Sequence, residues 1–173
     1  MVQVRRSIAT VSVVAVLALA LGACAQNQNG PGAANLTNDG TSGGRNAPAT
    51  PGSRRDFAQN VGDLVYFTTD SSDLTPEAQQ TLRGQAQWLA QYPRYTITIE
   101  GHADERGTRE YNIALGARRA TSVKEFLRRS GVDPRRIRTI SFGKERPVAV
   151  CDDISCWSQN RRSQTVLNNR VGS

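Results

Sequence analysis

The residues best suited to chemistry gather in the segment HADERGTREYNIALGARR, which begins at His102. Asp104 and Arg106 fall on its Gly-containing loop, and Arg118 and Arg119 fall on the helical run that follows. Successive side chains on a helix point about 100° apart, so only one of the two arginines can face the loop. A carboxylate and a guanidinium at one pocket would suit a zwitterion, because a guanidinium can bind a carboxylate through two parallel hydrogen bonds. The alternative is a salt bridge between Asp104 and Arg119 that ties the loop to the helix.

Catalysis would need groups that the sequence does not bring together. Nucleophilic catalysis needs a Ser, Cys or Thr beside a base, and a metal hydrolase needs His and carboxylate ligands. His102 is the only His in the chain, so we interpret it as a packing or loop residue rather than a ligand. Asp104 with Glu105 or Glu110 could form a glycosidase pair, but neighbouring loop residues do not specify the required separation. We therefore expect a binding protein with no metal site, and a hydrolase is the alternative.

The first 23 residues have the zones of an export signal. Arg5 and Arg6 form a basic start, and residues 8–21 form a largely apolar core. That core is shorter than the about 20 residues that a membrane-spanning helix needs. We therefore expect a signal peptide at residues 1–23 rather than a permanent transmembrane helix.

The four residues LGAC, which end at Cys24, resemble the lipobox of bacterial lipoproteins. The resemblance implies that Cys24 becomes the first mature residue and carries covalent lipid, and we expect no other cofactor. Several acyl chains anchor a protein firmly, where one chain binds only marginally. Many such proteins have an Asp after the Cys when they stay in the inner membrane. Ala25 therefore favours the inner leaflet of the outer membrane, facing the periplasm. An ordinary signal with a chance Cys is the alternative.

Composition and charge divide the rest of the chain and limit its partners. Residues 24–55 are rich in Gly, Pro and polar residues, so we expect the lipidated Cys and a disordered tether there. Residues 56–173 are expected to form one domain. The chain has 22 Lys and Arg against 15 Asp and Glu, which suggests an anionic partner. Export argues against nucleic acid and favours cell-wall polymer, anionic lipid or an acidic protein.

Hydrophobic periodicity predicts two long helices and four strands. The first helix, at 76–91, has Thr75 as its N-cap and Pro76 at its first position. The second helix, at 109–129, should bury the side made of Ile113, Ala117, Ala120, Val123 and Leu127. The strands are expected at 63–67, 95–101, 137–143 and 163–168. This order predicts an α+β fold, a two-layer sandwich with two main helices on a small mixed four-stranded sheet.

Two cysteines remain near the C-terminus, in the stretch VCDDISCWSQNRR. Because an exported chain enters an oxidising compartment, we expect Cys151 and Cys156 to form a local disulfide. Trp157 is expected to cover the sheet edge or the disulfide, and one of Arg161 and Arg162 is expected to be a buried structural partner.

The run from His102 to Leu127 resembles the core motif of the OmpA-like peptidoglycan-binding domains, as do VYFTTDSSDLTPEAQ before it and SFGKERPVA and CWSQNRRSQTVL after it. The resemblance covers nearly all of the expected domain. It implies non-covalent recognition of diaminopimelate in the stem peptide of peptidoglycan. In that family an Asp, which falls on Asp104, receives the ammonium of the free D-centre. An Arg, which falls on Arg119, receives the carboxylate of that centre.

Further contacts of the family fall on Asp70, Arg106, Thr108, Asn112 and Leu115. Thr68 is a departure, because lipid-anchored members often have an Asp there, and any contact of that carboxylate is in doubt. Three charged residues of the motif are expected to be solvated: Glu105, Arg109 and Arg118.

The resemblance also implies a role in the cell envelope. A lipid anchor, a tether and a wall-binding domain in series would link the outer membrane to peptidoglycan. Lipid-anchored members work with TolB and TolA in envelope integrity and constriction at division, so these two proteins are the expected partners. Another OmpA-like wall-anchoring accessory protein, or a peptidoglycan-cleaving enzyme, is the alternative.

Overall fold

The computed structural model describes residues 48–168, so the expected signal peptide, Cys24 and most of the expected tether lie outside the described residues. In chain order the elements are α1 (Arg54–Asp56), a π-helical turn (Phe57–Val61), β1 (Leu64–Tyr66), α2 (Pro76–Gln91), β2 (Thr96–His102), α3 (Arg109–Arg129), a 3-10 turn (Pro134–Arg136), β3 (Ile137–Gly143), α4 (Ile154–Asn160) and β4 (Arg162–Asn168). Within the described part of the chain, no helix is both long enough and apolar enough to cross a membrane.

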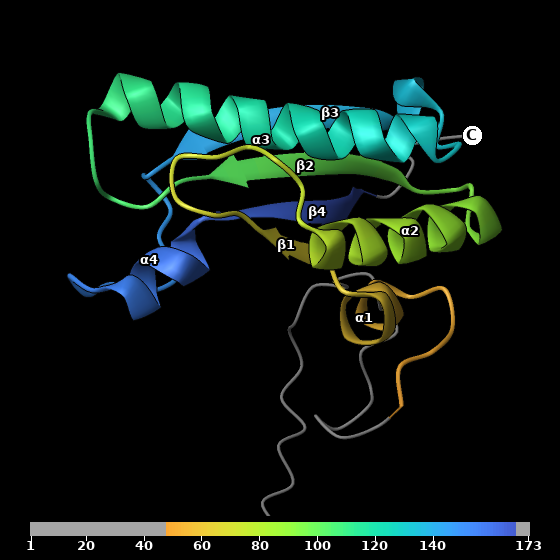
Figure 1. The fold of residues 1–173 in the computed structure, drawn as a ribbon. Helices are drawn as coiled ribbons and strands as arrows, with labels where there is room; N and C mark the ends of the chain where they lie inside the picture. Colours follow the sequence, from red (N-terminus) through yellow and green to blue (C-terminus); the bar gives the residue numbers. More distant parts are fainter. Residues whose placement is uncertain (1–47, 169–173) are drawn as a thin grey trace, which may run out of the picture. The chain divides into compact units, whose positions relative to one another are not determined.

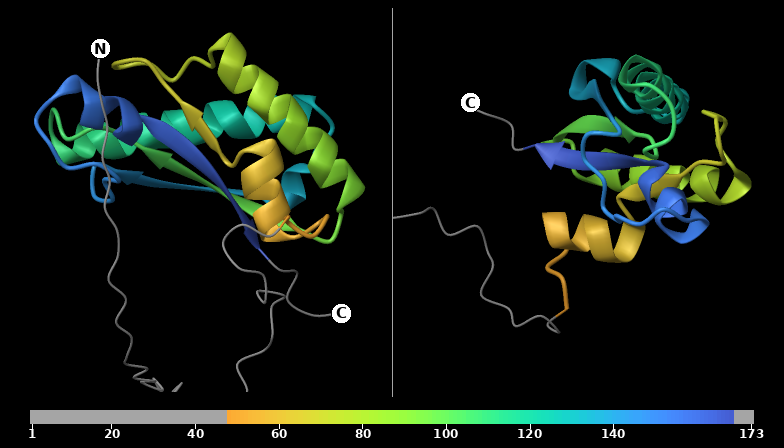
Figure 2. Two further views of the ribbon diagram at one scale, coloured as in Figure 1. Left: turned by 90° about the horizontal axis from the view of Figure 1, so that it is seen from below. Right: turned by 90° about the vertical axis from the view of Figure 1, so that its left-hand side faces the viewer.

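The four strands form one mixed sheet in the order β1-β4-β2-β3. β2 and β3 are parallel and are joined through α3, as a parallel pair requires a long crossover. β4 is antiparallel to both β1 and β2. Figures 1 and 2 show α2 and α3 side by side along one face of this sheet. The predicted α+β two-layer sandwich is confirmed.

Both long helices have the predicted bounds, because their N-terminal caps fix where they start. The hydroxyl of Thr75 accepts a hydrogen bond from the backbone N–H of Ala78 at 3.2 Å. The hydroxyl of Thr108 accepts from the backbone N–H of Tyr111, also at 3.2 Å. Each cap satisfies one of the N–H groups that have no partner in the first turn of a helix.

The core lies between the helices and one face of the sheet. The strand alternation that the sequence predicts is confirmed at Tyr95, Ile97 and Ile99, which are all buried. The helices contribute, among others, Leu82 and Leu89 from α2 and Ala120, Val123 and Leu127 from α3. Burial of this apolar surface is the main force that holds the two layers together.

The first half of α3 differs from the prediction. Ala117 was expected on the buried side, but it is exposed. Four other residues are buried instead: Asn112, Leu115, Gly116 and Arg119. Three of these four residues, Asn112, Leu115 and Arg119, line the candidate site described below rather than the apolar core. Apolar periodicity could not find this face, since two of its members are polar.

The four short helical elements of the described residues were not predicted, and two of the regions that hold them bear on the site and the domain boundary. α4 interrupts what was expected to be a long loop, and its helix starts at the side-chain cap of Asp153. At the other end, residues before Asp56 already pack on the body: the carbonyl of Gly52 accepts hydrogen bonds from the Tyr95 hydroxyl at 2.9 Å and from Arg94 at 2.7 Å. The packed region therefore begins several residues before the expected tether boundary at residue 55.

The expected disulfide is present. Cys151 and Cys156 are bonded, with their Cα atoms 5.7 Å apart. The bond closes a short loop that leads into the first turn of α4.

Glycines allow α3 to approach β2 at backbone contact distance. A Cβ on Gly116 would lie 2.4 Å from the hydroxyl oxygen of Ser141, and a Cβ on Gly101 would lie 1.9 Å from the Gly116 carbonyl oxygen.

Gly116→Ala should therefore destabilise the fold by about 2 kcal/mol or more through overpacking. Gly84→Ala in α2 is a matched control, because its Cβ would make only an ordinary 3.5 Å contact with Val61. That change should stabilise by up to about 1 kcal/mol through helix propensity. Urea unfolding measures both, and effects of the same sign would contradict the packing argument.

His102 makes stability depend on pH. Its ring packs against Phe142 with 5.5 Å between centroids, and neither ring nitrogen has a hydrogen-bond partner among the described residues. Burial, assisted by the charges of Arg162 and Arg146, lowers its pKa to about 4 from the usual 6.5.

The unfolded chain therefore binds a proton at His102 more readily than the folded one does. The contribution of His102 to the free energy of unfolding should be constant above about pH 6.5 and should fall as the pH drops toward 4. Urea unfolding between pH 7 and 5 measures this loss. His102→Leu should abolish it, and an equal loss in that variant would contradict the assignment.

Candidate functional site

A cavity of about 270 Å³ lies where the β1–α2 loop, the β2–α3 loop and the first half of α3 meet. Its lining residues are Thr69, Asp70, Asp104, Arg106, Gly107, Tyr111, Asn112, Leu115 and Arg119. Six of the seven residues predicted for ligand binding are therefore brought together. A larger cavity of about 590 Å³ lies beside the second half of α3, but none of the predicted residues lines it.

Arg119 is fully buried, and its guanidinium is held by main-chain carbonyl groups. It donates to the carbonyl oxygens of Ser71 at 2.8 Å, His102 at 2.8 Å and Thr68 at 3.1 Å. These bonds use three of the five N–H groups that an arginine offers. None of these partners is a carboxylate, although the positive charge of the guanidinium is buried away from water. Burial is the main reason that its pKa falls to about 10, and Asp104 and Asp70 partly oppose that fall. Arg119 is therefore a charged, oriented donor at neutral pH.

Asp104, unlike Arg119, already has partners of opposite charge, because two arginines bond to its carboxylate. Arg106 donates to its two carboxylate oxygens at 2.7 and 3.2 Å, and Arg161 donates at 3.2 Å. Burial alone would raise the pKa of Asp104, but the hydrogen bonds from Arg106 and Arg161 outweigh it and hold that pKa below its usual value. The salt bridge between Asp104 and Arg119 that the sequence left open is not formed, since the ion pairs of Asp104 are to Arg106 and Arg161.

The two arginines at the start of β4 are both buried, whereas the sequence predicted that one would be. Arg161 links Asp104 to the end of β1, since it also donates to the carbonyl oxygen of Phe67 at 3.2 Å. Arg162 donates to the carbonyl oxygen of Arg146, also at 3.2 Å, away from the cavity. Arg161 is therefore part of the site's framework, and Arg162 is not.

The remaining predicted residues have distinct positions. Asn112 donates to the carbonyl oxygen of Arg106 at 2.7 Å, so it fixes the loop from the side of α3. Leu115 gives the cavity an apolar wall. Asp70 has a positive φ of 54°, an uncommon conformation for a residue other than glycine, and its carboxylate reaches the rim of the cavity. Thr108 does not line the cavity, because its hydroxyl caps α3. Thr68 contributes its carbonyl oxygen to Arg119, so its side chain is not needed for that contact.

Tyr111 lines the cavity and Trp157 contacts one of its loops, although the sequence analysis assigned neither residue to the site. The hydroxyl of Tyr111 donates to Asp70, which joins α3 to the β1–α2 loop. Tyr111 lies one helical turn before Leu115 on the same side of the helix, and that spacing could have revealed it.

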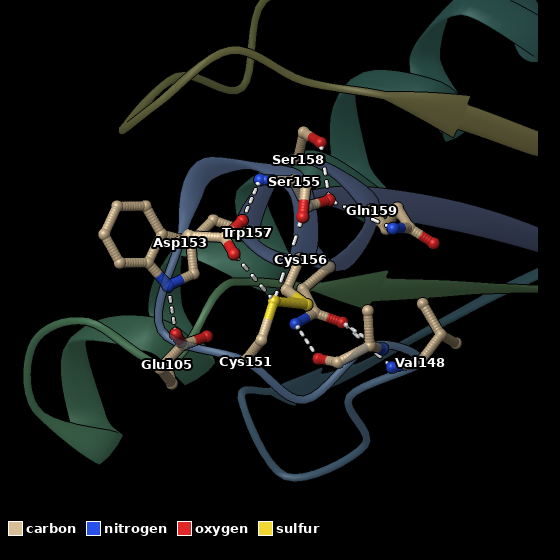
Figure 3. The surroundings of a disulfide bond; sticks show 11 residues. Glu105, Val148, Cys151, Asp153, Ser155, Cys156, Trp157, Ser158 and Gln159 are labelled. Atoms are coloured by element: carbon tan, nitrogen blue, oxygen red, sulfur yellow. Dashed lines mark hydrogen bonds between the residues drawn. A yellow bond between two sulfur atoms is a disulfide. The ribbon is translucent and has the colours of Figure 1, made fainter.

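Trp157 was expected to cover the disulfide or the sheet edge, but it contacts the β2–α3 loop. Its indole N–H donates to Glu105, as Figure 3 shows. Glu105 is therefore not simply solvated.

Comparisons with known proteins agree with this fold. Residues 66–161 match the OmpA family. A peptidoglycan-associated lipoprotein of Agrobacterium fabrum is 61% identical over 151 residues, which cover 87% of this chain and 83% of that protein. One of Pseudomonas aeruginosa is 42% identical over 149 residues, which cover 84% of this chain and 88% of that protein.

Solved structures extend the comparison to three dimensions. The crystal structure of the peptidoglycan-associated lipoprotein from Burkholderia pseudomallei has a TM-score of 0.63 at 39% identity, over 66% of this chain and 98% of that chain. The C-terminal domain of Helicobacter pylori MotB has a TM-score of 0.59 at 22% identity, over 63% of this chain and 86% of that chain, and shows the shared fold alone. The chain therefore belongs to the OmpA family and, within that family, to the peptidoglycan-associated lipoproteins.

Proposed function

We propose that the domain binds peptidoglycan non-covalently by receiving the free D-centre of diaminopimelate in the cavity. The observation that carries this proposal is Arg119, a buried cation with no carboxylate among its described hydrogen-bond partners. A buried charge is costly unless it is paired. A ligand carboxylate would supply the missing anion, and the remaining N–H groups of the guanidinium could donate to it.

The ammonium of the same centre would bind on the acidic side of the cavity. Asp104 and Asp70 both line it, so they are the carboxylates within reach of one small ligand. Of the two arginines on Asp104, Arg161 has a buried side chain, whereas that of Arg106 is 42% exposed. Arg106 can therefore shift to admit the ammonium, while Arg161 keeps Asp104 in place. Leu115 would contact the methylene chain of the ligand.

The rest of the chain would connect this site to the membrane. The lipid on Cys24 and the tether between Cys24 and the packed region would hold the domain at the inner leaflet of the outer membrane, facing the periplasm. The names of the relatives, which are lipoproteins associated with peptidoglycan, support this arrangement. Within the Tol-Pal system the partners would be TolB and TolA, and the role would be envelope integrity and constriction at division.

Binding is proposed ahead of catalysis because relatives of 56% to 61% identity are named for association with peptidoglycan and not for a reaction. A turnover assay on purified sacculi separates the two classes of function. Release of soluble muropeptides by the pure protein would favour the enzyme.

Variants of Arg119 and Asp104 test the proposed contacts with the ligand carboxylate and the ligand ammonium. Arg119→Lys keeps the positive charge but loses the planar donor arrangement, and Asp104→Asn removes the negative charge at nearly constant shape. Each should weaken co-sedimentation with sacculi that contain diaminopimelate by about tenfold or more, the usual effect of losing one charge-assisted hydrogen bond. Arg128→Lys is the matched control, because Arg128 is an exposed arginine on the same helix that does not line the cavity, and it should bind normally. Thermal melts show whether each variant is folded, and folded Arg119→Lys and Asp104→Asn proteins that sediment like the wild type would refute the site.

Cys24 carries the prediction for the membrane. Cys24→Ser removes the thiol that the lipid would be attached to, so the protein should leave the membrane fraction and appear in the soluble periplasmic fraction. Fractionation with antibody detection measures this, and Cys151→Ser is the control that keeps Cys24. A Cys24→Ser protein that stays membrane-bound would show that the lipid anchor is not what holds it.

A further inference from the structure

Trp157 lies outside the cavity but supports the loop that carries Asp104. We infer that Trp157 is a positioning residue for the ligand site, acting on Asp104 through Arg106 and Glu105, and that the Cys151–Cys156 disulfide keeps it in place. The inference rests on the proposed function, because it assigns Trp157 a part in the same ligand contact.

One side chain holds both residues that follow Asp104. The guanidinium carbon of Arg106 lies 4.3 Å from the centroid of the Trp157 ring, while the same guanidinium bonds to Asp104. The indole N–H of Trp157 donates to the carboxylate of Glu105, the residue between them, and Figure 3 shows this bond beside the disulfide. Trp157 therefore fixes the β2–α3 loop from one side, and Asn112 fixes it from the side of α3.

The stacking has a physical purpose at this position. A partly exposed arginine on a loop has many rotamers, and ordering its side chain costs up to about 2 kcal/mol. A cation on the face of a tryptophan ring offsets part of this cost. Arg106 is then held where it can bond to Asp104, and it can remain stacked on the ring when the ligand ammonium takes its place at the carboxylate. Trp157 thereby keeps Asp104 in one orientation in both states.

The disulfide is what makes so short a helix a firm support. α4 has 7 residues, too few for a helix to be stable by itself. Cys156, directly before Trp157, is bonded to Cys151 in the loop that precedes the helix. At its other end the buried side chain of Asn160 accepts from the N–H of Val148 and donates to the carbonyl oxygen of Ala149, each at 2.8 Å. Figure 3 shows the disulfide and Val148 beside this helix.

Reduction of the disulfide should therefore loosen Trp157 and weaken ligand binding. A dithiol such as dithiothreitol reduces the bond by exchange: two electrons and two protons pass to Cys151 and Cys156, which become thiols, and the dithiol becomes a disulfide. Cys151 is exposed, so the dithiol can reach its sulfur.

The test is calorimetric titration of the full-length chain in detergent with a diaminopimelate-containing stem tetrapeptide. Trp157→Ala should weaken binding by about tenfold, within the range expected for losing a partly desolvated stack. Trp157→Phe keeps a ring for Arg106 but loses the donor to Glu105, so its affinity should lie between those of the wild type and Trp157→Ala. Ile154→Ala is the matched control, because Ile154 is 62% exposed on the same helix, and it should bind like the wild type. Melting temperatures of the three variants should stay close to that of the wild type, and dithiothreitol should lower wild-type affinity in the same direction as Trp157→Ala.

Other results would overturn the inference. Wild-type affinity in Trp157→Ala would show that the support is not needed. If Trp157→Phe bound as weakly as Trp157→Ala and both melted early, the effect would be general unfolding rather than positioning. If the wild type itself failed to bind the tetrapeptide, the proposed function would fail, and this inference would fail with it.

Discussion

The buried guanidinium of Arg119 organises the site, because the segments around it are held together by their hydrogen bonds to it. The carbonyl groups that hold Arg119 come from the β1–α2 loop and the end of β2, so the guanidinium fixes these two segments against α3. This requires α3 to lie very close to β2, and the contact between Gly101 and Gly116 permits it. Carbonyl dipoles orient the guanidinium but do not neutralise its charge. A ligand carboxylate would do both.

The acidic side of the cavity follows a different logic. Asp104 is bonded to Arg106 and Arg161, and both bonds help to keep it charged in a mostly buried place. An ammonium group can replace a cation there without leaving the carboxylate unpaired. The ammonium end of the ligand would therefore exchange with a cation that is already present. The carboxylate end would bind Arg119, which has no carboxylate among its described hydrogen-bond partners. That difference makes the carboxylate end the stronger determinant of specificity.

The sequence predicted the local features and missed those that depend on distant contacts. The bounds of α2 and α3 could be predicted because Thr75 and Thr108 are caps that act within one turn. The site residues came from resemblance to a family, and six of seven line one cavity. No local pattern could reveal that Asp104 pairs with Arg161, which is 57 residues away, or that Trp157 bonds to Glu105, which is 52 residues away. The seven-residue α4 was also missed, since its stability comes from a disulfide and from Asn160 rather than from helical periodicity.

The central claim is that Arg119 receives a ligand carboxylate, and one comparison tests it directly. The full-length chain is titrated by calorimetry with a stem peptide that contains diaminopimelate and with the matching lysine peptide, which lacks the D-centre carboxylate. We expect the diaminopimelate peptide to bind about tenfold more tightly or better, because an ion pair with hydrogen bonds forms at a buried site. Equal affinity for the two peptides would contradict it.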